Sequence, residues 1–278
     1  MNPEFPVSDI ELRKVKTTRS VLLPIYSNST WQLNQHEFAM QVEGVASFYV
    51  CNGREVEFAP AEGATRESIE LYLNGSVYGA ILHQRNILPL HGSSFVSNGQ
   101  GIILCGGSGA GKSSLTAAFC MNGAEFLTDD VTPVVFPGGK PGIMPLSDRI
   151  KLWGDSLQQL NQNKSNLTAI HPGEDKFYFP MKKSRQLSYP LHRILIIEPA
   201  ELPTVEINLL TGIDSFTALR NEVYRWEYLV AMPDTETGYL EKLLTISRLI
   251  TVTKVKRPAA MPIETMRIFL SNYIDKGA

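Results

Sequence analysis

The sequence predicts a protein of the α/β class with a β-rich N-terminal part, and three features lead to this prediction. Residues 1–60 have the character of β structure, with a hairpin signal near their end. From Thr65 onward, apolar residues recur at the spacing of a helix. From Leu88 onward, segments typical of strands and of helices are mixed along the chain, which is the pattern of an α/β protein.

The hairpin signal lies in residues 48–58. Two strand-like segments, Phe48–Cys51 and Arg54–Phe58, flank the pair Asn52-Gly53. An Asn-Gly pair suits a tight hairpin turn because both of its residues tolerate a positive φ. The helix that follows is predicted from the apolar residues at every fourth position, and it should end near Arg85-Asn86. This apolar stripe consists of Ile69, Leu73, Val77 and Ile81.

A second hairpin is predicted at the start of the α/β region. Phe95-Val96 and Gly101–Cys105 are expected to be short strands, joined by the turn 97–100. Its Asn-Gly pair again favours the positive φ values that a tight turn needs. The second strand runs directly into a glycine-rich segment, residues 106–113.

A helix and a further strand follow the glycine-rich segment. Residues 114–121 are predicted to be helical, and Gly123 is suited to end that helix. Glu125–Thr128 is predicted to be a strand that leads into Asp129-Asp130. This strand should run parallel to the one before the glycine-rich segment, so both should end at the same edge of the sheet.

The rest of the chain is less diagnostic. Asp214 is expected to cap a helix that continues to about Val230. Loops are expected at 137–142 and at about 161–174. We predict two domains, a β-rich region with one helix at 1–86 and a second domain at 87–278. The remaining expected elements are strands at 191–198 and 204–210, an extended segment at 249–255, and helices at 236–248 and 263–274.

Composition excludes several classes of protein. The 26 basic and 28 acidic residues give a net charge of −2, so no overall charge favours binding to nucleic acid or to an anionic membrane. The three cysteines are too few and too far apart for a disulfide framework or a zinc site. Residues 1–5 lack the basic start and apolar run of a secretory signal. We therefore expect a cytoplasmic protein.

The glycine-rich segment matches the phosphate-binding P-loop pattern in full, and it stands between a predicted strand and a predicted helix. Its glycines allow the backbone amides to turn inward around a phosphate, and the helix that follows adds a partial positive charge. The Lys112 amine can reach phosphate oxygens, and the Ser113 hydroxyl is suited to bind Mg²⁺. The candidate nucleotide-binding residues are Gly106, Gly107, Ser108, Gly109, Ala110, Gly111, Lys112, Ser113 and Ser114.

Two acidic residues follow the next strand. If the chain turns at the end of this strand, Asp129 and Asp130 can serve one site, although successive side chains of a strand point to opposite sides. One carboxylate could then bind Mg²⁺ while the other accepts a proton from an attacking hydroxyl. An aspartate pair at the end of a strand also occurs as a simple turn or helix cap.

The combination of these segments resembles the kinase domain of HPr kinase/phosphorylase. It is more closely similar to the HPr-kinase-related proteins found with peptide-modification systems, including lasso-peptide precursor kinases. The residues that carry the resemblance are Leu88–Gly92, Gly106–Ser113 and Leu127–Asp130, with looser similarity at Arg149–Trp153 and Lys176–Pro180.

The resemblance implies a P-loop kinase core of HPr-kinase type for 87–278, and it implies roles for single residues. Lys112 and the Gly106–Ser113 loop would hold the nucleotide phosphates, and Ser113 would bind Mg²⁺. Asp129 would be the general base, and Asp130 would assist with the metal or with Lys112. His91, by itself more often a structural residue, would lie beside the base and the phosphate.

The function that follows is ATP- and Mg²⁺-dependent transfer of the γ-phosphoryl group to a serine hydroxyl of a peptide or protein. The second signature of the bifunctional enzymes has no counterpart here, so the resemblance does not extend to dephosphorylation or to HPr as the substrate. The alternatives are a kinase for a small hydroxylated molecule, a P-loop ATPase or nucleotide switch, and a binding module without activity. A homo-oligomer is compatible with the sequence. Candidates for an assisting arginine are Arg149, Arg193, Arg220, Arg225 and Arg248.

Overall fold

The computed structural model describes the whole chain except residues 1–6, 8, 172 and 277–278. The expectation about a secretory signal concerns residues 1–5 and so lies outside the described residues. The described residues form two compact units. Unit 1 comprises the chain up to Pro89 together with 223–244, and unit 2 comprises 90–222 together with the chain from Thr245 onward. The predicted division at residue 86 stays a prediction, because these units are defined by compactness alone.

Unit 1 contains a six-stranded sheet in the order β1-β6-β5-β4-β3-β2. β1 pairs with β6 in parallel, and the other neighbours are antiparallel. The predicted hairpin is confirmed: Asn52 and Gly53 have φ values of +51° and +61° between β5 and β6. The strands are β1 (Glu11–Lys14), β2 (Tyr26–Ser27), β3 (Trp31–Leu33), β4 (Glu37–Val42), β5 (Ala46–Cys51) and β6 (Glu55–Pro60).

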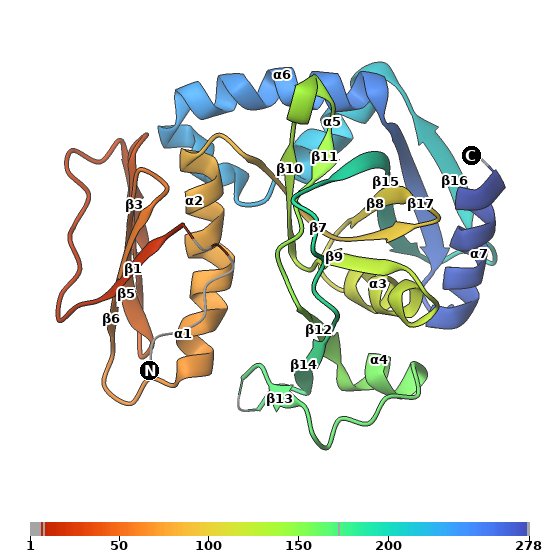
Figure 1. Ribbon diagram of the computed structural model, residues 1–278, viewed down its shortest axis with the longest axis horizontal. Coiled ribbons are helices and arrows are strands. Elements are labelled where there is room, and N and C mark those ends of the chain that lie inside the picture. The colour runs from red at the N-terminus through yellow and green to blue at the C-terminus, as the bar shows by residue number, and fades with distance from the viewer. Residues whose placement is uncertain (1–6, 8, 172, 277–278) are drawn as a thin grey trace. The chain divides into compact units, whose positions relative to one another are not determined.

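One helical segment covers one face of this sheet (Figure 1). It consists of α1 (Arg66–Tyr72), a π-helical turn at Leu73–Val77, and α2 (Tyr78–Gln84). All four residues of the predicted stripe are buried in the core between helix and sheet, and the helix ends where the sequence predicted. The segment starts at Thr65, whose hydroxyl accepts a hydrogen bond from the Ser68 amide.

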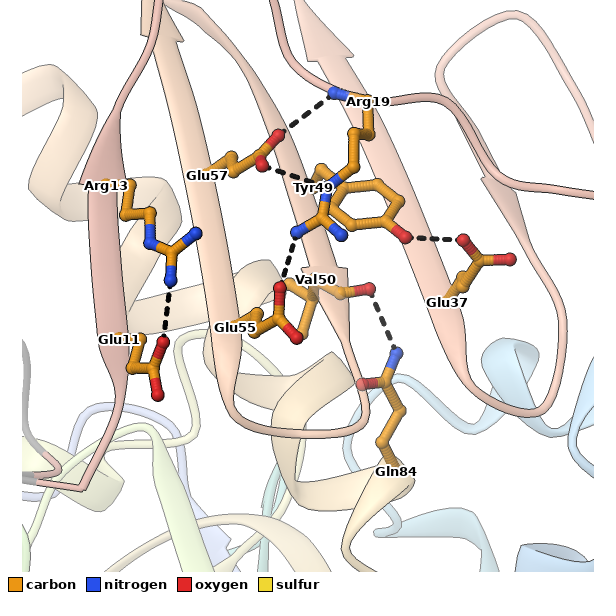
Figure 2. Close-up of polar contacts among 9 residues, drawn as sticks. All are labelled: Glu11, Arg13, Arg19, Glu37, Tyr49, Val50, Glu55, Glu57 and Gln84. Atoms are coloured by element: carbon orange, nitrogen blue, oxygen red, sulfur yellow. Dashed lines mark hydrogen bonds and ion pairs between the residues drawn. The ribbon is translucent and has the colours of Figure 1, made fainter.

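The opposite face of the sheet carries charged side chains (Figure 2). Arg19 bridges two strand residues, with 2.8 Å to Glu55 and 2.9 Å to Glu57, and Tyr49 donates a hydrogen bond to Glu37. Apolar residues therefore gather on the helix-covered face, and ion pairs occupy the other face, as expected for an antiparallel sheet with one buried side.

Unit 2 is built on a larger mixed sheet in the order β11-β10-β7-β8-β15-β17-β16, with β9 paired to β7. β8, β15 and β17 are parallel to one another at its centre, and α3 (Lys112–Met121) and α7 (Ile263–Lys276) contribute to the core that they form. The strands are β7 (Leu88–Ser97), β8 (Gln100–Cys105), β9 (Glu125–Thr128), β10 (Val131–Val135), β11 (Gly142–Ile143), β15 (Tyr189–Ala200), β16 (Glu206–Leu210) and β17 (Thr251–Pro258).

The direction of β9 decides where the acidic pair lies. Both β8 and β9 pair antiparallel with β7, so they run in the same direction. The glycine loop after β8 and Asp129 after β9 therefore come to the same edge of the sheet, as the sequence predicted. The hairpin β7–β8 is also confirmed, with Asn98 and Gly99 at φ values of +50° and +78°.

A small sheet of three strands forms beside this edge. β12 (Arg149–Trp153) pairs with β14 (Lys176–Pro180), which also pairs with β13 (Thr168–Ala169). The short helix α4 (Gly154–Gln159) follows β12 directly. Apolar residues of β12 and α4, among them Ile150 and Leu157, are packed with Ala117 of α3 in one buried cluster.

The helix predicted from Asp214 to about Val230 is wrong in both of its limits. α5 spans Gly212–Asn221, with Thr211 as its N-cap and Asp214 in its first turn. The chain leaves the helix because its backbone joins β7: the Glu222 carbonyl accepts from the His91 amide at 2.7 Å, and the Tyr224 amide donates to Pro89 at 2.9 Å. Sheet hydrogen bonds from a distant segment thus replace helical ones.

The other expected elements are present with small shifts at their ends. α6 (Pro233–Leu249) and α7 cover the two predicted C-terminal helices, and β15, β16 and β17 cover the predicted strands. In the described residues of the predicted loop regions, the regular structure is the short β11 and β13 and a single turn of 3₁₀-helix. Among the described residues, no helix combines the length and the apolar character that crossing a bilayer requires.

Candidate functional site

The glycine loop between β8 and α3 has the backbone conformation that its sequence demands. Gly106, Gly109 and Gly111 have φ values of +128°, +78° and +95°. Gly106 also passes so close to β15 that a Cβ atom on it would lie 2.2 Å from the carbonyl oxygen of Ile197. Only glycine satisfies both conditions, so this position is determined by the fold as well as by the loop.

We expect Gly106→Ala to lower the free energy of unfolding by about 1–3 kcal/mol, because a backbone carbonyl cannot move aside as a side chain can. Gly107→Ala is the matched control, since a Cβ atom there has no neighbour within 4 Å and φ is not positive. Urea denaturation of both variants measures the difference. Equal stability of the two alanine variants would contradict the close approach to β15.

Lys112, the first residue of α3, turns back over the loop. Its amine is largely buried and donates to the carbonyls of Gly106 at 2.6 Å and Gly107 at 3.1 Å. Burial lowers the pKa of this amine below its usual range. Arg257, at the end of β17, supports the loop from another side, because its Nε donates to the Ala110 carbonyl at 3.1 Å. Two cationic side chains thus lie against the loop.

The Ser113 hydroxyl links the loop to the acidic pair. Its Oγ donates to Oδ1 of Asp129 at 2.7 Å, and Oδ2 of Asp129 accepts from the backbone amide of Lys151 at 2.8 Å. Both carboxylate oxygens are therefore engaged, one by α3 and one by β12. Burial, and after it the negative charge of Asp130, raises the pKa of Asp129 above its usual range.

Asp130 reaches the same site through an unusual turn. Its φ is +70°, and the Val131 amide donates to the Asp129 carbonyl at 2.9 Å across it. The chain thereby bends between β9 and β10, both of which lie beside β7, and this bend allows both carboxylates to serve one site. Asp130 then meets two basic groups: Lys151 donates to Oδ2 at 2.8 Å, and Nε2 of His91 lies 3.6 Å from Oδ1.

The charges at Asp130 determine its protonation. Burial by itself raises the pKa of Asp130, but Lys151 and His91 together hold that pKa far below its usual range. Burial lowers the pKa of Lys151, and the two aspartates more than offset this and raise it. Asp130 and Lys151 therefore form an ion pair across the neutral pH range.

A chain of buried hydroxyl groups lies next to the turn at Asp129-Asp130. Ser94 and Thr128 share a hydrogen bond of 2.7 Å, Thr128 and Thr132 share one of 2.5 Å, and Thr132 donates to the Gly92 carbonyl at 2.9 Å. The Gly92 amide in turn donates to the Asp130 carbonyl at 3.1 Å. The residues on both sides of the acidic pair are thus tied to β7, the strand that carries His91.

We expect Lys151→Met to destabilise the protein near neutral pH by about 1–3 kcal/mol, less than for a fully buried pair because the Asp130 side chain is 34% exposed. An acid with a lowered pKa in the folded state stabilises that state above its unfolded pKa, and the contribution disappears as the pH falls below it. The stability gap between wild type and variant should therefore narrow below about pH 4. Urea denaturation at several pH values measures this gap, and a gap that does not change with pH would contradict the ion pair.

The glycine loop and Asp130 border one cavity of about 820 Å³, within the range of small-molecule sites. His91, Asp130 and loop residues 108–114 line it, whereas Asp129 lies behind Ser113, and Gly106 and Gly107 adjoin a smaller cavity of about 230 Å³. The structure thus brings together the predicted site residues, which lie far apart in sequence.

Several site residues were missed by the sequence analysis. Lys151 and Trp153 lie in a segment that was noted only for its looser resemblance to the kinase family. Because they are two residues apart on a strand, their side chains point to the same face, and this spacing could have predicted that both line the cavity. Arg257 lines the cavity, and none of the five arginines considered from the sequence does so. Glu222 accepts from the Gly106 amide at 3.0 Å, and burial raises its pKa. Neither Arg257 nor Glu222 has a recognisable motif around it.

Comparison with known proteins gives distant structural similarity. No protein-family model matches the chain, and no curated protein matches it. Among solved structures, the HPr(Ser) kinase/phosphatase from Coxiella burnetii is similar with a TM-score of 0.36 and 12% sequence identity, over 68% of this chain and 89% of that chain. This similarity is too distant to indicate a function, and the residues of the site itself are the better guide.

Proposed function

We propose that this protein is an ATP- and Mg²⁺-dependent kinase that transfers the γ-phosphoryl group to a serine hydroxyl of a peptide or protein. The observation that carries the proposal is the 2.7 Å hydrogen bond from Ser113 to Asp129 at the foot of the glycine loop. A hydroxyl at the start of this helix and a carboxylate on a neighbouring strand are the two protein groups that hold Mg²⁺ in P-loop enzymes. The serine acceptor rests on the sequence resemblance.

The residues present fit a nucleotide with its metal. The loop is open on its cavity side at Gly109, where a Cβ atom would meet nothing within 4 Å, so phosphate oxygens can approach the backbone. Across the described residues, no three His, Cys, Asp or Glu side chains gather as a metal-binding cluster. This agrees with Mg²⁺, which binds through one or two carboxylates together with substrate phosphates.

Bound ATP and Mg²⁺ would supply the phosphoryl group and neutralise part of its charge. The loop amides, Lys112 and Arg257 bind the phosphate oxygens and keep them in one position. To do so, the Lys112 amine exchanges its present carbonyl partners for phosphate, which is favourable because a charged partner forms the stronger hydrogen bond.

The contacts favour different chemical roles for the two aspartates. Asp129 is bonded to the Ser113 hydroxyl, so it belongs to the metal side of the site. Asp130 lines the cavity, so it can contact the acceptor hydroxyl and accept its proton late in transfer, when phosphoryl bonding has made that proton acidic enough for a carboxylate of low pKa. This order is the reverse of the one implied by the resemblance, in which Asp129 is the base. His91 is placed to orient Asp130.

The test is a transfer assay with γ-labelled ATP, Mg²⁺ and a panel of serine-containing peptides. Peptides encoded by the neighbouring reading frames are the first candidates, each paired with a Ser→Ala version. We expect label on the serine peptide and none on its alanine partner. Rapid release of phosphate without any labelled peptide would instead support an ATPase or nucleotide switch, and label on a small hydroxylated molecule alone would replace the acceptor class.

A further inference from the structure

The cavity has a second half whose chemistry differs from that of the phosphate loop. It includes Trp153, the last residue of β12, which is 47% exposed. A tryptophan exposed in a cavity offers a large flat surface for stacking. Lys176, the cross-strand partner of Trp153 on β14, holds its amine 5.0 Å from the centre of the indole ring. One face of the indole is thus occupied by a cation from its own sheet.

The position of Trp153 is coupled to the glycine loop. α4 begins directly after it, and Ser156 of α4 accepts a hydrogen bond from the Ser114 hydroxyl at 2.8 Å. The turn from β12 into α4 is tight, because a Cβ atom on Gly154 would lie 2.0 Å from a carboxylate oxygen of Asp175. The Gly154 amide also donates to the Asp175 carbonyl at 2.8 Å. These contacts hold Trp153 in a fixed position relative to the glycine loop, and therefore relative to a phosphate bound there.

An apolar wall completes this half of the cavity. It is formed by the segment Ala259–Ile263, which contains no charged side chain, and by Met266. The wall is tied to the loop through Arg257, which donates to the Ala110 carbonyl, and to α4 through Gln159, which accepts from the Ile263 amide at 3.2 Å. Hydrogen bonds thus join both the wall and the helix that follows Trp153 to the glycine loop.

A ligand that carries both anionic groups and a flat ring fits a cavity lined by the glycine loop, by Trp153 and by an apolar segment. We propose that Trp153 and the wall 259–263 form the base-binding slot of a purine nucleotide whose phosphates lie in the glycine loop, an inference that rests on the proposed function. A purine fits better than a pyrimidine because the larger ring system covers more of the indole.

The test compares ligands with and without a base. Binding of ATP and of tripolyphosphate is measured by calorimetry for wild type, Trp153→Ala, Trp153→Phe and Lys112→Ala. We expect Trp153→Ala to weaken ATP binding about 5- to 150-fold, the range for loss of one base–aromatic stack, and to leave tripolyphosphate binding unchanged. Trp153→Phe should restore most of the affinity, and Lys112→Ala should weaken both ligands.

Fluorescence gives a second readout that does not depend on the folding of the alanine variant. The chain has three tryptophans, and Trp153 is the one in unit 2. ATP should quench the tryptophan emission of wild type more than tripolyphosphate does. This difference between the two ligands should disappear in Trp153→Phe and remain in the control Trp226→Phe.

The possible results distinguish failure of the base-binding proposal from failure of the proposed kinase function. Unchanged ATP affinity in Trp153→Ala, with tripolyphosphate still bound through Lys112, overturns the slot and leaves the kinase proposal intact. A raised KM for an acceptor peptide with unchanged ATP affinity also overturns the slot and assigns Trp153 to the acceptor. Failure of wild type to bind either ligand overturns the proposed function and the slot with it.

Discussion

Lys112→Ala is expected to weaken nucleotide binding and to reduce kcat/KM for phosphoryl transfer by about 100- to 1,000-fold, the cost of removing one preorganised donor from a charged transition state. The amine lies within the loop and has no charged partner there, since it donates to the carbonyls of Gly106 and Gly107. Its loss leaves two carbonyl groups that can turn to water, so the fold should persist. Calorimetry with ATP and the peptide-transfer assay measure the two effects.

Lys183→Ala is the matched control, because Lys183 is exposed and lies outside the cavity. Both variants remove one positive charge, so any general effect of net charge is common to them. Activity of Lys112→Ala equal to that of Lys183→Ala would contradict phosphate binding by this loop.

Asp129→Asn and Asp130→Asn should impair different steps, Mg²⁺ binding in the first and proton transfer in the second. Asp129→Asn should raise the Mg²⁺ concentration needed for half-maximal activity, because the amide is a weaker metal ligand than the carboxylate beside Ser113. Asp130→Asn should bind Mg²⁺ and ATP normally and lose about 100- to 10,000-fold in kcat, the range for loss of a general base. Its fold should be retained, since asparagine tolerates the φ of +70° at this turn.

Magnesium titrations at saturating ATP, combined with single-turnover transfer, separate the two effects. Asp148→Asn serves as the control, since Asp148 is an exposed carboxylate just before β12. If Asp129→Asn retains normal Mg²⁺ dependence and loses only kcat, the roles are those implied by the resemblance, with Asp129 as base.

Features that depend on a few neighbouring residues were predicted correctly. The turns at Asn52-Gly53 and Asn98-Gly99 follow from the φ values that these residues tolerate. The stripe from Ile69 to Ile81 predicted a helix, because its four-residue period matches one helical face. The glycine loop between β8 and α3 was recognised for the same reason, since its conformation is encoded in its own residues.

Features that depend on distant partners were missed. Lys151 meets Asp130 because β12 pairs with β14 to form a separate small sheet, and neither strand carries a motif for this site. Arg257 reaches Ala110 across a long separation in sequence. The expected helix from Asp214 ended early because Glu222 and Tyr224 joined the backbone of β7, and propensity within the segment contains no information about that strand.

The division between the two kinds of feature has a physical cause. Backbone φ values and apolar periodicity are set within a few residues, so the glycine loop, the turns and the order of strands and helices were readable before any fold was known. The partners of each carboxylate and the walls of the cavity depend on which strands pair, and pairing is decided by packing of the whole unit. The amino-acid order thus predicted a phosphate-binding loop, whereas folding brought Ser113 to Asp129, Lys151 to Asp130, and Trp153 to the cavity that the loop borders.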